Sequence, residues 1–95
     1  MVPSDSMVLS YVNNALRDAI TTDTLTACLR DAAFAARFRE HITAFFLEVP
    51  IPRIDAFATA HAIGHSDLLR VWRWLSAHGR EQRPELDRWL VEMAS

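Results

Sequence analysis

The stretch that most constrains the fold is residues 54–75, IDAFATAHAIGHSDLLRVWRWL. Apolar residues recur at helical spacing on both sides of Ala62-Ile63-Gly64, a segment short enough to form a tight turn. The pattern predicts one helix over about 52–61 and a second over about 65–77. The residues expected on the inner sides of these two helices are Ile54, Phe57, Ala58, Leu68, Val71, Trp72 and Leu75.

This arrangement resembles the helix-turn-helix of DNA-binding domains. In that motif a small residue lies where the helices cross, an apolar residue fills the turn, and apolar positions close the second helix onto the first. The matching residues are Ala58, Ile63, Leu68 and Val71. The resemblance implies binding to double-stranded DNA, as in transcriptional regulators. A looser likeness of AFATAHAIGHSDLLRVWRWL to the N-terminal domain of phage small terminase subunits implies a role in recognising DNA for packaging.

The same residues are also compatible with a plain helical hairpin, since two positions depart from the motif. Ala62 stands where the motif usually has glycine, and a left-handed backbone costs a residue with a Cβ roughly 1 kcal/mol. Gly64 could take that angle instead, which would make the turn one of another type. His61 stands where the end of the first helix is usually apolar.

The outer face of the second helix carries the candidate DNA contacts. At about 100° per residue, Ser66, Arg70 and Arg73 cluster opposite the apolar arc. Arginine reaches guanine edges or phosphates in a major groove, and serine bonds phosphate. An ordinary solvated helix face would look the same, and Asp67 beside it would be repelled by phosphate. With flanking phosphate contacts included, the predicted DNA-binding residues are His65, Ser66, Arg70, Arg73, Arg53 and Arg80.

A second hypothesis is a helical adaptor or inhibitor that docks on a partner protein. It draws on the acidic N-terminal half, the broad apolar band of the first helix and three Trp in a short C-terminal region, because aromatic residues dominate interface energies. Trp74 on a polar face is expected to pack under a neighbouring helix or in a homodimer interface. An exposed patch of Trp74, Trp89 and Met93 would indicate self-association or a protein partner.

The remaining chain reads as further helices, and no segment alternates apolar and polar residues over more than a few positions. Helices are expected over about 6–20, 24–30, 32–48 and 84–94, with either Thr22 or Asp23 capping the second and Asp31 the third. One continuous helix over 24–49 is the alternative. Gly79 is expected to end the helix over 65–77 in a left-handed conformation. The predicted fold is all-α, a small orthogonal bundle of five or six helices.

Composition and charge set limits on these hypotheses. The chain has 95 residues, 51% of them hydrophobic, which indicates one folded domain over 1–95, with N-terminal helices over 6–49, the helix-turn-helix over 52–78 and a C-terminal helix over 84–94. The net charge of −2 argues mildly against nucleic acid. The charge is uneven, however: four Arg face six acidic residues before Pro50, and six of each follow from there.

Several classes of function find no support in the sequence. There is no Gly-rich phosphate loop and no elbow-type serine, so we expect no enzyme and no cofactor. Cys28 lies between Leu25 and Leu29 and is expected to be a buried, inert thiol. His61 and His65 are four apart but the turn separates them, so we expect no metal site. The absence of a long apolar run and of a signal peptide predicts a cytoplasmic protein that avoids membranes.

Overall fold

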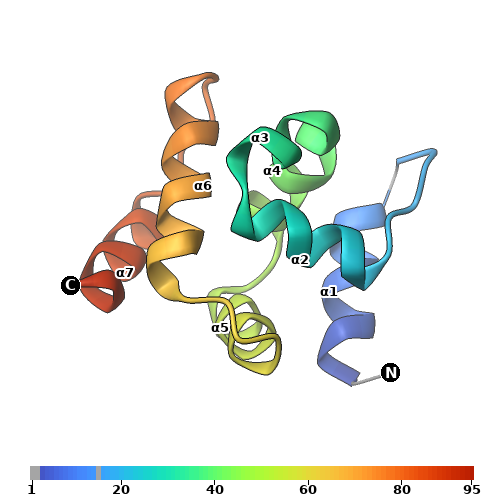
Figure 1. The fold of residues 1–95 in the computed structure, drawn as a ribbon, viewed down its shortest axis with the longest axis horizontal. Helices are drawn as coiled ribbons and strands as arrows, with labels where there is room; N and C mark the ends of the chain where they lie inside the picture. Colours follow the sequence, from blue (N-terminus) through green and yellow to red (C-terminus); the bar gives the residue numbers. More distant parts are fainter. Residues whose placement is uncertain (1–2, 15) are drawn as a thin grey trace.

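The computed structural model describes residues 3–14 and 16–95, with side chains from Asp5 onward, and this part is helical with no β-strand (Figure 1). Because α3, η1 and α4 follow one another directly, they form one bent segment, and six helical segments result. This confirms the predicted small all-α bundle. The helices are α1 (Pro3–Asn13), α2 (Thr22–Arg30), α3 (Ala32–Ala35), the 3₁₀ helix η1 (Ala36–Phe38), α4 (Arg39–Glu48), α5 (Ile51–Ala60), α6 (His65–Ala77) and α7 (Pro84–Ala94).

The helices pack around α4 and α6. In Figure 1, α6 stands upright with α7 on one side and α2 and α3 on the other, while α1 lies on the far side of α2. Aromatic rings of α4 join its neighbours, because Phe45 packs 6.0 Å from Phe57 of α5 and Phe46 packs 5.5 Å from Trp72 of α6, measured between ring centroids. These rings are almost completely buried and form the centre of a single core.

The prediction of a helix over 6–20 is wrong, because α1 ends at Asn13. The side-chain amide of Asn13 donates to the carbonyl of Ile20 (3.1 Å) and accepts from its backbone N–H (2.9 Å). These bonds close a loop where the periodic pattern suggested more helix. Within the predicted helix over 6–20, Val8 and Val12 are buried in α1, whereas Ala19 lies in the loop and is exposed. Ala15, in the same predicted helix, lies outside the described residues.

The N-terminal ends of α2 and α3 are both capped by side chains. The hydroxyl of Thr21 accepts from the backbone N–H of Thr24 at 3.2 Å, so Thr21 is the cap of α2 and the expectation of Thr22 or Asp23 is wrong. Asp31 caps α3 as predicted, with Oδ1 accepting from the N–H of Ala33 at 2.9 Å. The chain therefore breaks at Asp31, and the alternative of one continuous helix is not found.

Three arginines complete the C-terminal ends of helices that are distant in sequence. The Arg30 side chain donates to the carbonyl of His61 (2.7 Å), after α5, and Arg39 donates to that of Leu75 (3.3 Å) in α6. Arg83 donates to the carbonyls of Phe46 (2.9 Å) and Val49 (2.7 Å) at the end of α4. Each bond adds a donor at the C-terminal end of a helix and places positive charge at the negative end of its dipole. The carbonyl of Leu75 also accepts from the backbone N–H of His78.

The expected left-handed Gly79 is also wrong, because no glycine in the described residues has a positive φ and His78 caps α6. The absence of a side chain at Gly79 has a different consequence. A Cβ at position 79 would come too close to the carboxylate of Glu81 and the guanidinium of Arg39, so the ends of these two side chains would have to move. Glycine therefore leaves room for the ion pair between Arg39 and Glu81.

Candidate nucleic-acid interface

The candidate interface is built on α5, the turn after it and α6. The bounds of α6 match the prediction, and α5 begins and ends one residue earlier than expected. Ala58 is 1% exposed, and Ile63 in the turn is 4% exposed. All the residues predicted for the inner sides of these helices are buried. The packing positions of the predicted motif are therefore apolar and enclosed.

The turn takes its left-handed residue at Ala62, with φ of 57°, whereas Gly64 has φ of −70°. The structure therefore places the strained angle at the position where the motif usually has glycine, and not at Gly64. The N–H of Ile63 donates to the carbonyl of Ala58 at 2.8 Å, and that of Ala62 donates to Thr59 at 3.2 Å. These bonds satisfy carbonyls at the end of α5 and direct Ile63 into the core.

His61, the second departure from the motif, is accommodated by packing and a hydrogen bond. Its ring lies 4.6 Å from that of Phe57, and Nε2 lies 2.9 Å from Oδ1 of Asp5 in α1. Asp5 is one of few buried polar side chains among the described residues, with 5% exposure. The bond between Asp5 and His61 connects α1 to the end of α5, although the two residues are 56 positions apart in the sequence.

The outer face of α6 presents Ser66, Arg70, Arg73 and Ala77 to solvent, as the helical period indicated. The guanidinium of Arg70 donates from Nη1 to Oδ1 of Asp67, one turn earlier, at 2.9 Å. The side chains of this pair are 65% and 37% exposed. An exposed pair of this kind contributes at most about 1 kcal/mol to the free energy of unfolding, so the fold does not depend on it.

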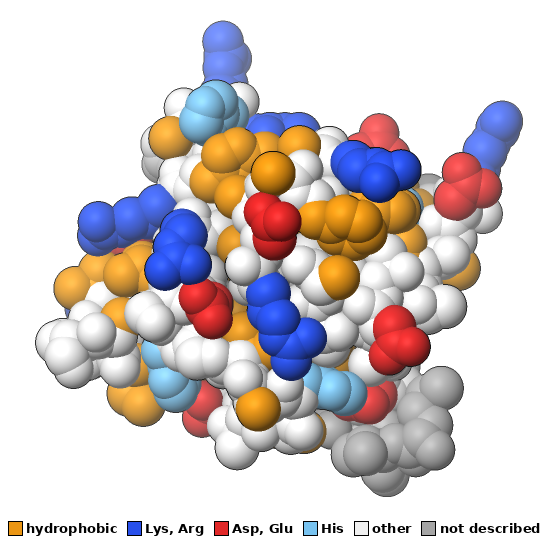
Figure 2. Space-filling view, viewed as in Figure 1, with side chains coloured by type: hydrophobic (Ala, Val, Ile, Leu, Met, Phe, Trp, Pro, Cys, Tyr) orange, Lys and Arg blue, Asp and Glu red, His pale blue; other side chains and the backbone are white. Residues whose placement is uncertain are grey.

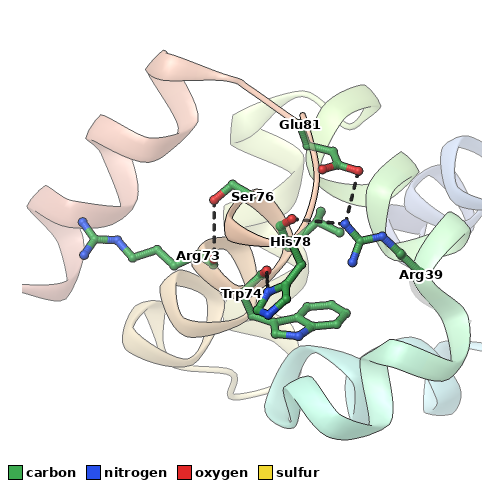
Figure 3. A network of polar contacts seen from close by, with 7 residues as sticks. Arg39, Arg73, Trp74, Ser76, His78 and Glu81 are labelled. Atoms are coloured by element: carbon green, nitrogen blue, oxygen red, sulfur yellow. Dashed lines mark hydrogen bonds and ion pairs between the residues drawn. The ribbon is translucent and has the colours of Figure 1, made fainter.

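The side chain of Arg73 takes no part in the polar contacts around the end of α6. Its carbonyl accepts from the hydroxyl of Ser76, while its guanidinium extends away from the other residues drawn in Figure 3. Arg53 is partly buried, Arg73 and Arg80 are exposed, and none of the three forms an ion pair with a residue that the structure describes.

The His65 side chain has partners on two neighbouring helices, unlike a freely exposed side chain. Its Nε2 lies 3.0 Å from Oδ1 of Asp55 in α5, and its ring meets the edge of Trp89 in α7 at 5.4 Å. The ring is therefore fixed between three helices. Of the predicted contacts, the structure brings Ser66, Arg70 and Arg73 onto one exposed face and places His65 at its border.

The two tryptophans predicted to form an interface lie on opposite flanks of α6. The guanidinium of Arg39 lies 5.3 Å above the ring of Trp74, and the ring of His78 is 6.0 Å away (Figure 3). Trp89 instead packs on His65. His65 precedes Trp74 by nine residues in α6, so the two residues lie on opposite sides of this helix. Both rings are half-buried, whereas Met93 at the end of α7 is 49% exposed. The structure therefore does not join Trp74 and Trp89 in one patch.

Charges of both signs surround the candidate interface. On the face shown in Figure 2, arginine and acidic side chains are interspersed across the surface. Asp55 bonds His65 and Asp67 bonds Arg70, and neither of these pairs was predicted. The spacing of Asp67 and Arg70, three apart on one helix, is a signal that could have identified that pair. The pair of Asp55 and His65 spans the turn and carries no such signal.

Cys28 is buried as predicted, and burial raises the pKa of its thiol from 9.0 to about 11. The thiol is therefore protonated near neutral pH and is a poor nucleophile. Within the described residues, no three histidine, cysteine or acidic side chains are grouped closely enough to hold a metal ion. None of the described helices is both long and apolar enough to cross a membrane.

Comparisons of the chain with protein families, with curated proteins and with solved structures find no significant match.

Proposed function

We propose that this protein binds double-stranded DNA as a helix-turn-helix domain, with α6 as the helix that enters the major groove. The observation that carries the proposal is the division of α6 into two sides. One side closes on the core through Leu68 and Val71, while the other presents Ser66, Arg70 and Arg73 together to solvent. A helix of 13 residues is about 20 Å long, and a B-DNA major groove of about 12 Å width admits such a helix.

The use of the arginines supports this proposal. Arg30, Arg39 and Arg83 are hydrogen-bonded to the ends of other helices and are needed for the fold. In contrast, Arg53, Arg73 and Arg80 have no ionic partner among the described residues. These three arginines lie within or next to the helix-turn-helix, where they would contact phosphate groups. Arg17, Arg37 and Arg88 also form no ion pair with described residues, but they lie outside the motif. Regulation of transcription and recognition of DNA for packaging are both roles for such a domain.

A pair of double variants tests this proposal. We expect Arg70→Ala with Arg73→Ala to preserve the helical content but to weaken binding to duplex DNA at least tenfold, because removing an arginine that bonds a base edge costs about 1–3 kcal/mol. The slope of log affinity against log salt concentration is expected to fall by roughly one for each phosphate that the variant no longer neutralises. The measurements are circular dichroism and fluorescence anisotropy at several salt concentrations.

The matched control is Arg17→Ala with Arg88→Ala, which removes the same charge from exposed positions outside α6. It is expected to retain most of the affinity. The proposal is abandoned if the wild-type protein binds no duplex at low salt, or if the control loses as much affinity as the α6 variant.

A second candidate function, docking on a partner protein, is favoured by the surface between α1 and α4. Met7 and Tyr11 of α1 are 40% and 37% exposed. Beside them is a shallow hollow of about 270 Å³, lined by Tyr11, Asn14, Leu16, Glu40, Ala44 and Glu48. Glu40 and Glu48 form no ion pair with the residues described here, and they are about 12 Å apart along α4. This combination fits a partner helix with apolar side chains between two basic ones.

A synthetic amphipathic helix with arginines at the spacing of Glu40 and Glu48 tests this candidate by calorimetric titration. Wild-type protein is expected to bind it, and Glu40→Gln with Glu48→Gln is expected to weaken binding roughly tenfold, since each charge pair contributes up to about 1 kcal/mol. The Arg70→Ala, Arg73→Ala variant provides the control and should bind the helix normally. Equal binding by the glutamine variant would exclude this surface. Homodimer formation stays a prediction, for which sedimentation analysis is the measurement.

A further inference from the structure

We infer that Arg70 reads a guanine base and that Asp67 is the positioning residue that orients it. This inference rests on the proposed function, since it concerns how α6 would distinguish one DNA sequence from another. It starts from the ion pair on the exposed face of α6, in which Nη1 of Arg70 donates to Oδ1 of Asp67 at 2.9 Å.

The geometry of this bond leaves the recognition edge of the guanidinium free. Arginine has five N–H donors in a planar fork. The bond to Asp67 uses Nη1, so the adjacent donors on Nε and Nη2 remain available as a parallel pair. Such a pair matches the O6 and N7 acceptors of guanine, which is the commonest specific contact of arginine in the major groove. Because 65% of the Arg70 side chain is exposed, this edge can reach a base.

Position along α6 distinguishes Arg70 from Arg73. In helix-turn-helix proteins, the N-terminal residues of the recognition helix contact the base edges. Arg70 lies in the second turn of α6, with Asp67 in the first. Arg73 lies one turn further on, and Figure 3 shows its guanidinium extended away from the neighbouring polar groups. This arrangement suits a flexible phosphate contact for Arg73 and a fixed base contact for Arg70.

Asp67 would also act against binding to the wrong sequence. A carboxylate near the DNA backbone is repelled by the phosphates, so it lowers affinity for every duplex. At the correct site, the bond from Arg70 to guanine offsets this cost, because Asp67 holds the guanidinium in the required orientation and reduces the entropy lost on binding. At other sites the repulsion remains. The pair would therefore trade affinity for specificity.

The experiment uses a randomised pool of duplexes, from which wild-type protein selects its preferred sequence. We expect an enriched guanine whose replacement by 7-deazaguanine, which lacks the N7 acceptor, weakens binding roughly tenfold. In Asp67→Asn this penalty is expected to shrink to about twofold or less, while affinity for the unselected pool rises. Arg70→Lys keeps the charge but lacks the fork, so it should lose the guanine preference. Arg73→Lys is the matched control and should keep it.

The outcomes separate this inference from the proposed function. If wild-type protein binds no duplex, both are overturned. If it binds and selects a guanine, but Asp67→Asn keeps the full penalty for 7-deazaguanine, only the role of Asp67 is overturned. If the enriched sequence contains no guanine sensitive to Arg70→Lys, the assignment of Arg70 is wrong. Circular dichroism of each variant verifies the fold, and small effects are expected because Asp67 and Arg70 lie outside the core.

Discussion

At the scale of single residues, Ala62 holds an unfavourable backbone conformation. It has a φ of 57° and is the one non-glycine residue with a positive φ in the described part of the chain. A left-handed angle costs a residue with a Cβ about 1–2 kcal/mol, and glycine avoids that cost. Strain held in a turn between two helices is tolerated only because the surrounding contacts, above all Ile63 in the core, fix the backbone.

Ala62→Gly is therefore expected to stabilise the protein. We expect the free energy of unfolding to rise by about 0.5–1 kcal/mol, since relief of the left-handed strain exceeds the additional entropy that glycine gives the unfolded chain. Urea denaturation measures this change. The matched control is Ala56→Gly, at an exposed position inside α5, which should lower stability by up to about 1 kcal/mol. A loss of stability in both variants would contradict the strain at Ala62.

The exposed face of α6 shows which residue properties the sequence could predict. The helical period determines which side chains face outward, so Ser66, Arg70 and Arg73 were placed correctly. Their neighbours depend on how other helices pack. The ring of His65 meets Trp89 only because α7 lies beside α6, and no pattern within residues 65–77 contains that information.

At the scale of helices, arginine side chains donate hydrogen bonds to backbone carbonyls at the C-terminal ends of other helices. The side chain of Arg83 is 17% exposed and binds two carbonyls at the end of α4, while its Nε donates to Glu85 at 3.2 Å. Arg80 lies only three residues earlier but is exposed and forms no ion pair with described residues. The two arginines are alike in sequence and different in their surroundings.

Arg83→Ala is expected to lower the free energy of unfolding by about 1.5–3 kcal/mol, because the variant cannot form the charged hydrogen bonds to partly buried carbonyls. Arg80→Ala should change it by no more than about 0.5 kcal/mol. Thermal and urea denaturation of both variants measure the difference. Equal effects at the two positions would show that Arg83 contributes only its charge.

The bounds of helices were predicted well where a local signal marks both ends. Gly64 precedes α6 and His78 with Gly79 follows it, and its bounds agree with the prediction. The end of α1 was missed because Asn13 bonds the backbone of Ile20, seven residues later, and apolar periodicity contains no trace of such a loop. The 3₁₀ helix η1 inside the predicted helix over 32–48 also has no sequence signal that we can identify.

At the scale of the whole molecule, the class of fold followed from composition and periodicity, but the charge distribution did not. The sequence shows six arginines after Pro50, and only the structure shows that Arg83 among them is committed to the end of α4. Arg30 and Arg39 are committed in the same way in the N-terminal half. The surface charge available to a polyanion is therefore concentrated in the second half of the chain, although the formal charges there cancel.

The arginine bonds between distant segments have a consequence for how much of the chain is needed to make the recognition unit. The last turn of α5 is completed by Arg30 and that of α6 by Arg39, residues that precede their carbonyl partners by 31 and 36 positions. Both helix ends gain these arginine donors only when the N-terminal half has docked. Excising residues 51–78 would thus yield a frayed peptide, and transplanting the motif onto another scaffold would require bringing its two donors along.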